Sequence, residues 1–166
     1  SSLHDIAWLL NVRGGDISYV PVVLSYLALS QDSCIWFLQE EVVTETLKAY
    51  LDKNGIQTRP YDDFYEYVKH IDEKETVLLN TLIVNYRICD SLPDGVKVID
   101  AEDPTVVMKA VKNEVQLENL RKAHLKDAVA MCKFMYWLKT NIGKIPMTEI
   151  SASDYLASLR AEQEGF

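Results

Sequence analysis

The residue whose type and position best suit a binding role is Arg13, which directly precedes the glycine pair Gly14 and Gly15. Residues 6–10 form an apolar run before it, and this run predicts a buried strand that ends in a glycine turn. A guanidinium at the end of a strand can hold a carboxylate through paired hydrogen bonds, or it can fix a neighbouring loop. Two roles therefore stay open for Arg13: a structural ion pair with Asp16, which we expect first, and a contact to a substrate.

The histidines do not suggest a metal site, because such sites need several His, Cys or carboxylate side chains that converge on one ion. The three histidines lie in three separate segments, without a second ligand at helical spacing: His4, His70 and His124. His124 falls on the apolar stripe of a helical segment, where a histidine packed in a core or an interface is expected. We therefore predict no metal-binding residue in this chain.

Known catalytic motifs are also missing from the sequence. It has no Gly-x-Ser-x-Gly turn for a hydrolase nucleophile, and the pair Gly14-Gly15 lacks the third glycine of a dinucleotide-binding loop. Neighbouring carboxylates such as Glu40-Glu41, Asp62-Asp63 and Glu162/Glu164 are common in an acidic chain, so we expect them to lie on solvated surfaces. We predict no catalytic residue within these 166 residues.

The net charge indicates which partners are not expected for this protein, and the cysteines indicate the cellular compartment in which it functions. The formal net charge is −8 and the basic residues are dispersed, so the sequence offers no basic surface for nucleic acid. The three cysteines are odd in number, far apart and flanked by apolar residues: Cys34, Cys89 and Cys132. We expect reduced thiols packed in the core, as in a cytoplasmic protein.

The sequence also argues against a membrane segment. The longest apolar run, residues 20–29, contains Pro21 and Ser25 and falls well short of the roughly 20 apolar residues that a membrane helix needs. It is typical of a buried strand. The first residues lack a basic region followed by an apolar one, so no secretory signal is predicted.

The elements that would position Arg13 alternate between strands and helices through the first hundred residues. Apolar runs predict strands at residues 6–10, 22–29, 34–38, 56–59, 77–79 and 96–99. Helical spacing predicts helices at residues 44–53, 62–71 and 81–89. The second and third strands are joined by a short polar turn and should form an antiparallel hairpin. This order predicts an α/β fold with a mixed six-stranded sheet flanked by helices.

The pattern changes after residue 105. Apolar residues at helical spacing predict one long amphipathic helix over residues 113–142, which Gly143 and Pro146 end, and then a shorter helix over 152–163. The apolar face of such a helix needs a covering surface, and the short helix offers little, so we expect the chain to continue beyond Phe166. The predicted domains are residues 1–112 and 113–166.

Several blocks of this sequence, taken in order, resemble the aminopeptidase P family of Xaa-Pro aminopeptidases. These blocks are DIAWLLNVRG (5–14) with Asp16, Pro21-Val22, MKAVKNE (108–114), LRKAHLKDAVA (120–130) and TEISASD (148–154). The resemblance is to the three-domain form of the enzyme and extends over essentially the whole chain. It implies a middle domain of the creatinase amino-terminal fold in residues 1–112, and the opening helices of a pita-bread catalytic domain in residues 113–166.

The resemblance also implies a function. Enzymes of this family remove an amino-terminal residue that precedes proline, with two divalent metal ions, commonly manganese, held by two Asp, one His and two Glu. Those ligands would lie downstream of Phe166, so the resemblance places no cofactor in this chain. The chain would position the catalytic domain and shape access of the proline-containing peptide substrate, and the parent protein would be a homodimer.

Two alternatives remain open at this point. The same fold serves as a protein-binding module without catalysis in a histone chaperone, and the acidity of this chain is compatible with that use. Creatinase and prolidase share the catalytic fold but usually lack a third domain, and the link KAVKNE (109–114) favours aminopeptidase P. In related enzymes an amino-terminal domain can reach the active site, which is the functional alternative for Arg13.

Overall fold

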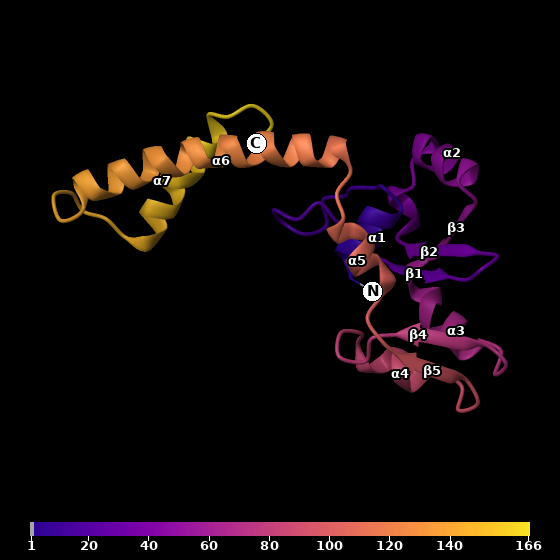
Figure 1. Cartoon of the computed structure of the whole chain (residues 1–166). Coiled ribbons are helices and arrows are strands. Elements are labelled where there is room, and N and C mark those ends of the chain that lie inside the picture. Colours follow the sequence, from indigo (N-terminus) through magenta and orange to yellow (C-terminus); the bar gives the residue numbers. More distant parts are fainter. Residues whose placement is uncertain (1) are drawn as a thin grey trace. The chain divides into compact units, whose positions relative to one another are not determined.

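The computed structural model describes residues 2–166 and divides the chain into two compact units, Ser1–Val111 and Lys112–Phe166. The first unit holds the strands, whereas the second consists of helices (Figure 1). The structure therefore has the mixed α/β character that the sequence predicts. Among residues 2–166, no helix combines the length and the apolar character needed to cross a membrane.

A three-stranded sheet forms the centre of the first unit. Strand β1 (Tyr26–Leu29) pairs antiparallel with β2 (Cys34–Leu38), and β2 pairs parallel with β3 (Ile56–Pro60). The β1–β2 turn is closed by Ser30, whose backbone N–H donates to the Ser33 carbonyl at 2.8 Å. The predicted antiparallel hairpin is thus confirmed.

Strand β2 is buried on both faces of this sheet. Trp36 and Leu38 point to one face, whereas Ile35 and Phe37 point to the other, because successive side chains of a strand alternate. All four side chains are buried. This burial on both sides explains why the segment is a continuous apolar run rather than an alternating pattern.

Helices cover both faces. On the first face, Ile6 and Leu10 from the α1 region (α1, Leu3–Leu9) and Leu51 of α2 (Glu45–Lys53) pack on Trp36 and Leu38. On the second face lie α3 (Phe64–Lys69) and α4 (Tyr86–Ser91). Phe64 stacks on Tyr26 with ring centroids 4.0 Å apart and meets Phe37 edge-on at 5.2 Å. Two short 3-10 helices, Glu40–Val42 and Tyr61–Asp63, complete the connections.

The prediction of a mixed six-stranded sheet is wrong. The remaining strands, β4 (Thr76–Leu79) and β5 (Lys97–Asp100), form a separate parallel pair, so the described residues hold a three-stranded and a two-stranded sheet. The run at residues 6–10, predicted as a strand, belongs to helix α1 and its C-cap. Ser2 caps this helix and Asp5 completes the capping box, so the apolar residues Ile6 and Leu10 share one helical face.

Helix α5 (Pro104–Ala110) closes the first unit and was not predicted. Asp103 is its N-cap and accepts hydrogen bonds from the backbone N–H and the hydroxyl of Thr105, at 3.0 and 2.7 Å. Pro104 occupies the first helical position, where a missing N–H costs nothing. This helix contacts α1.

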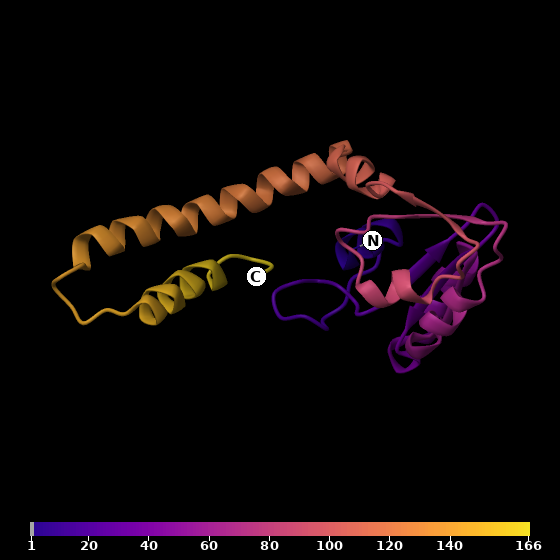
Figure 2. The ribbon, with the colours of Figure 1, turned by 90° about the horizontal axis from the view of Figure 1, so that it is seen from below.

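The second unit consists of a long and a shorter helix, as the sequence predicts, and the two form a hairpin. Helix α6 (Glu114–Asn141) and α7 (Glu149–Ala161) run side by side in opposite directions (Figure 2). Capping boxes begin both helices, at Asn113 and at Thr148. The rings of Trp137 and Tyr155 stack at 4.1 Å, and the ion pairs Lys133–Glu162 and Arg160–Asp127, both 2.7 Å, add polar links.

This second unit buries little apolar surface of its own. Among its described residues only Ala130 and Leu159 are buried. Its large exposed apolar residues are Val115, Leu120, Leu125, Val129, Met135, Tyr136, Ile142, Ile145, Ile150 and Phe166. The hairpin therefore keeps a broad apolar surface in contact with solvent.

Candidate functional site

Arg13 stabilises the carboxyl end of helix α1. Its Nη1 donates hydrogen bonds to the carbonyl oxygens of Ala7, at 3.0 Å, and Val12, at 2.8 Å. The helix ends in a Schellman motif, in which the left-handed residue Asn11 (φ 52°) lets Val12 N–H donate to the Ala7 carbonyl. Arg13 thus adds a second donor to the Ala7 carbonyl of the helix end and pairs with the carbonyl of Val12, just beyond the helix.

The expected ion pair between Arg13 and Asp16 is absent from the described residues. The Asp16 carboxylate instead accepts a hydrogen bond from the backbone N–H of Leu24 at 2.7 Å, across the base of the loop that joins α1 to β1. Two residues at the loop base are therefore held separately, Arg13 by carbonyl oxygens at and just beyond the end of α1, and Asp16 by Leu24 just before β1.

The glycine beside Arg13 lets the two sides of this loop approach closely. A Cβ atom on Gly14 would lie 2.4 Å from Val23 Cγ2 and 3.0 Å from the Val22 carbonyl oxygen. Only glycine fits such an approach without a shift of the returning chain.

The tip of the loop presents Tyr19 to solvent. Ile17 and Val20 form an isolated antiparallel bridge, and Tyr19 between them has a left-handed backbone (φ 67°) and a fully exposed side chain. A left-handed conformation costs a non-glycine residue about 1–2 kcal/mol. The Arg13–Leu24 loop is thus fixed at its base and carries an aromatic side chain at its tip.

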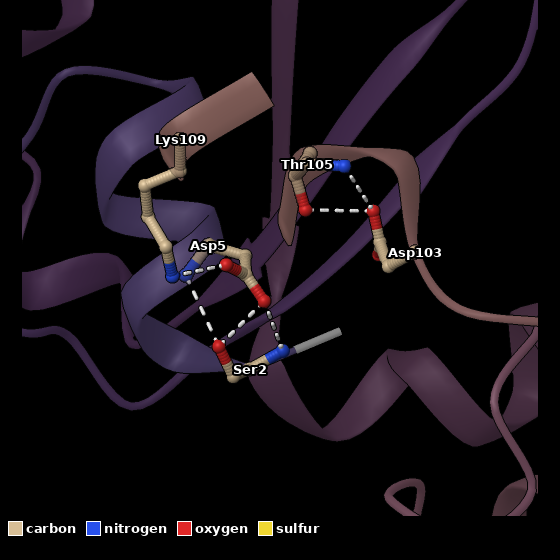
Figure 3. Close-up of polar contacts among 5 residues, drawn as sticks. All are labelled: Ser2, Asp5, Asp103, Thr105 and Lys109. Carbon is tan, nitrogen blue, oxygen red and sulfur yellow. Dashed lines mark hydrogen bonds and ion pairs between the residues drawn. The ribbon is translucent and has the colours of Figure 1, made fainter. Parts of the chain in front are cut away.

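A second polar cluster, centred on Asp5, joins the two ends of the first unit (Figure 3). The Asp5 side chain is only 6% exposed and forms an ion pair with Lys109 of α5 at 2.5 Å. Its other oxygen accepts from the Ser2 hydroxyl at 2.6 Å and the Ser2 N–H at 3.3 Å. Burial raises the pKa of the Asp5 carboxyl, but the hydrogen bonds from Lys109 and Ser2 and the Lys109 charge outweigh it, so the pKa lies below its ordinary value.

Sequence reasoning missed this pair. Ser2 followed by Asp5 has the spacing of a capping box and could have indicated helix α1. Lys109 lies 104 residues further along the chain, and no local pattern connects it to Asp5.

The other residues singled out from the sequence are not brought together. The three histidines are exposed, and His70 Nδ1 lies 2.8 Å from the carbonyl oxygen of Glu66 in its own helix. Within residues 2–166 no group of three His, Cys, Asp or Glu side chains is placed to hold a metal ion. The predicted carboxylate pairs are exposed, and Glu162 is engaged by Lys133.

The cysteines are free thiols, as expected, but they differ in burial. Cys34 and Cys89 are half-buried, whereas Cys132 is exposed on α6. The prediction of a core position is therefore wrong for Cys132, because α7 covers only part of the helix that carries it. Burial raises the pKa of the Cys34 thiol, which disfavours the reactive thiolate.

Two shallow hollows lie in the first unit. One, of about 300 Å³, lies between α4 and the β4–β5 pair, and the other, of about 250 Å³, lies beside the end of α1. Near the first, the Asp100 carboxylate accepts from the hydroxyl and N–H of Thr81, at 2.6 and 3.0 Å, which holds the pKa of Asp100 below its ordinary value. These contacts tie the ends of β4 and β5 together and form no nucleophile–base pair.

The fold and these contacts can be compared with known proteins. The sequence profile of the creatinase/prolidase N-terminal domain family matches residues 1–116. The chain therefore belongs to the creatinase/prolidase N-terminal domain family.

Within that class the similar proteins are Xaa-Pro aminopeptidases. "Probable Xaa-Pro aminopeptidase P" of Sordaria macrospora is 33% identical over 177 residues, and "Xaa-Pro aminopeptidase 1" of Dictyostelium discoideum is 31% identical over 173. Both alignments include 100% of this chain, but only 29% and 27% of the relatives. The chain thus spans less than a third of the length of the curated relatives it matches.

A solved structure similar to this chain is also that of an X-prolyl aminopeptidase. The X-prolyl aminopeptidase of Caenorhabditis elegans, a cytosolic enzyme with a di-nuclear active site, superposes with a TM-score of 0.84 at 27% identity. The match includes 99% of this chain and 28% of that enzyme. The chain shares the fold of one part of that aminopeptidase.

Proposed function

We propose that this chain is a non-catalytic part of a metal-dependent aminopeptidase that removes an amino-terminal residue preceding proline. The observation that carries the proposal is the match of 99% of this chain to 28% of an X-prolyl aminopeptidase with a di-nuclear active site. In this proposal residues 1–112 position the catalytic domain and shape access of the peptide, and residues 113–166 are its first helices. The parent protein would be cytoplasmic and would act as a homodimer.

The metal ions of the parent protein would be held by side chains outside this chain. The described residues do not fit such a site, since they bring together no three potential ligands. Two divalent ions, with manganese as our expectation, would activate water and polarise the scissile carbonyl when bound. We assign no catalytic step to residues of this chain.

The part of this chain proposed to face the peptide is the Arg13–Leu24 loop. Nη1 of Arg13 is engaged by carbonyl oxygens, but a guanidinium carries five N–H donors in all, so it retains donors for a substrate carboxylate. Tyr19 is fully exposed at the loop tip and adds an aromatic surface. Arg13 therefore has an observed structural role, its hydrogen bonds at the end of α1, and a proposed second role as a substrate contact.

Titration with Mn²⁺ tests this division of labour. The chain alone should bind Mn²⁺ no more tightly than its scattered surface carboxylates allow, in the millimolar range, whereas the full-length parent protein should bind two ions per subunit. Isothermal titration calorimetry of both proteins measures this. Tight stoichiometric binding by residues 1–166 alone would contradict the proposal.

A further inference from the structure

Helix α5 is attached to the first unit with little apolar burial. None of its residues is fully buried: Val106 is half-buried, whereas Val107 and Met108 are 62% and 54% exposed. Val111, directly after the helix, is 74% exposed. A helix of this length without a buried face gains little from packing and is held by specific contacts.

One specific contact is the ion pair between Lys109 of α5 and Asp5 of α1. The Asp5 carboxylate is buried, and its partners include Lys109 Nζ and the Ser2 hydroxyl. A buried carboxylate that loses a cationic partner is left poorly compensated, so this pair strongly favours the docked position of α5. Lys109 is itself only one-third exposed, so solvent screens the pair less than a surface pair.

The position of Lys109 in the chain gives this contact a wider consequence. Helix α5 ends at Ala110, the next residue, and α6 begins at Glu114, so only residues 111–113 separate the two helices. Asn113 is already the N-cap of α6, and its side chain accepts from the Gln116 N–H at 2.9 Å. A connection this short leaves few backbone dihedrals to absorb a displacement of α5.

We propose that the Asp5–Lys109 pair is a positioning device, which locks α5 onto α1 and so fixes the point at which the chain leaves the first unit. Asp5 and Lys109 are positioning residues in this scheme, because they act through α5 and touch no substrate. The inference deepens the positioning role proposed above and rests on it for its functional consequence. The lock itself is a property of residues 2–113.

The test uses the whole 166-residue chain with Lys109→Met, which removes the charge and keeps a long side chain. Hydrogen exchange measured by mass spectrometry should be at least about tenfold faster for the amides of residues 107–111, and unchanged for strand β2. Lys109→Arg retains a cation and should restore slow exchange. Lys122→Met is the matched control, because it removes an exposed pair with Glu118 at 2.6 Å within α6.

Two results would overturn the inference: unchanged exchange in residues 107–111, or equal acceleration in β2. Should Lys109→Met not fold, Asp5→Asn, which keeps an acceptor for Ser2, takes its place. Neither readout involves metal or peptide cleavage. A failure of the lock is therefore distinguishable from a failure of the proposed aminopeptidase function.

Discussion

At the scale of single residues, the ion pair between Asp5 and Lys109 links the beginning of the first unit to its end. Asp5 is one of only two buried polar residues of the described chain, together with Ser25, and its partners come from α5 and from the cap of α1. A buried charge is costly unless it is paired and hydrogen-bonded. The free energy of unfolding should therefore depend on whether the Asp5 carboxyl is ionised.

The pH dependence of unfolding should report this carboxylate. The folded-state pKa of Asp5 lies below its ordinary value, so its contribution is present above that ordinary value, about 3.9, and is lost as the pH falls through the folded pKa. Urea unfolding of the wild type between pH 6 and pH 2 should show this loss. The double variant Asp5→Asn/Lys109→Met should show a shallower acid decline, and an identical decline in both proteins would refute the assignment.

The two adjacent glycines offer a matched pair of substitutions. Gly14→Ala should destabilise the protein by about 1–3 kcal/mol, because the new Cβ would lie 2.4 Å from Val23 Cγ2. Gly15→Ala meets no atom within 4 Å and should be neutral or stabilise by up to about 1 kcal/mol. Urea midpoints of the two variants decide this, and equal effects would mean that the loop base is not closely packed.

At the scale of elements, strand β2 organises both faces of the sheet. Phe37→Ala should lower the free energy of unfolding by about 3–5 kcal/mol, because the ring is fully buried against Phe64. Leu29→Ala, on the neighbouring strand, should change it by less than about 0.5 kcal/mol, since Leu29 is 64% exposed. Guanidinium unfolding followed by far-UV circular dichroism measures both, and a small effect of Phe37→Ala would contradict the two-faced core.

Elements with local end signals could be predicted from the sequence. Helix α2 begins at the Thr44 cap and ends at Asn54-Gly55, and the α6 span follows from Asn113 and Gly143. Residues 6–10 could not be assigned by periodicity, because a short apolar run fits a strand or a buried helix equally well. The deciding signal was the cap at Ser2.

Long-range contacts lay beyond sequence reasoning. The apolar residues of helix α5, Val106 to Met108, are consecutive and not at helical spacing, and Lys109 pairs with a residue 104 positions away in the sequence. The same limit applies to Arg13, whose observed partners are backbone carbonyl oxygens that no residue type identifies. The separation of β4 and β5 from the larger sheet likewise depends on tertiary packing.

At the scale of the molecule, the two units differ in how much apolar surface each of them buries. The first has two apolar clusters on opposite faces of β2, whereas the second buries only Ala130 and Leu159 among its described residues. Local opening is easiest where few apolar contacts oppose it. The second unit should therefore behave as the less stable part of the chain.

Hydrogen exchange should reveal this difference. Amides in the centre of α6 and in α7 should exchange at least about a hundredfold faster than those of β2, because their opening needs little loss of buried apolar surface. Mass spectrometry of peptides from both units measures the rates at one pH. Equal protection would mean that the helical hairpin has a self-sufficient core, contrary to its pattern of exposure.

The central claim is that this chain is a non-catalytic part of an Xaa-Pro aminopeptidase, and the most direct test is peptide hydrolysis by its full-length parent protein. Loaded with Mn²⁺, that protein should release the first residue of a peptide with proline in second place and should leave the matched alanine peptide uncut. Residues 1–166 alone should cleave neither. A metal-loaded parent protein that folds but leaves the proline peptide intact would contradict the account and would favour a binding module instead.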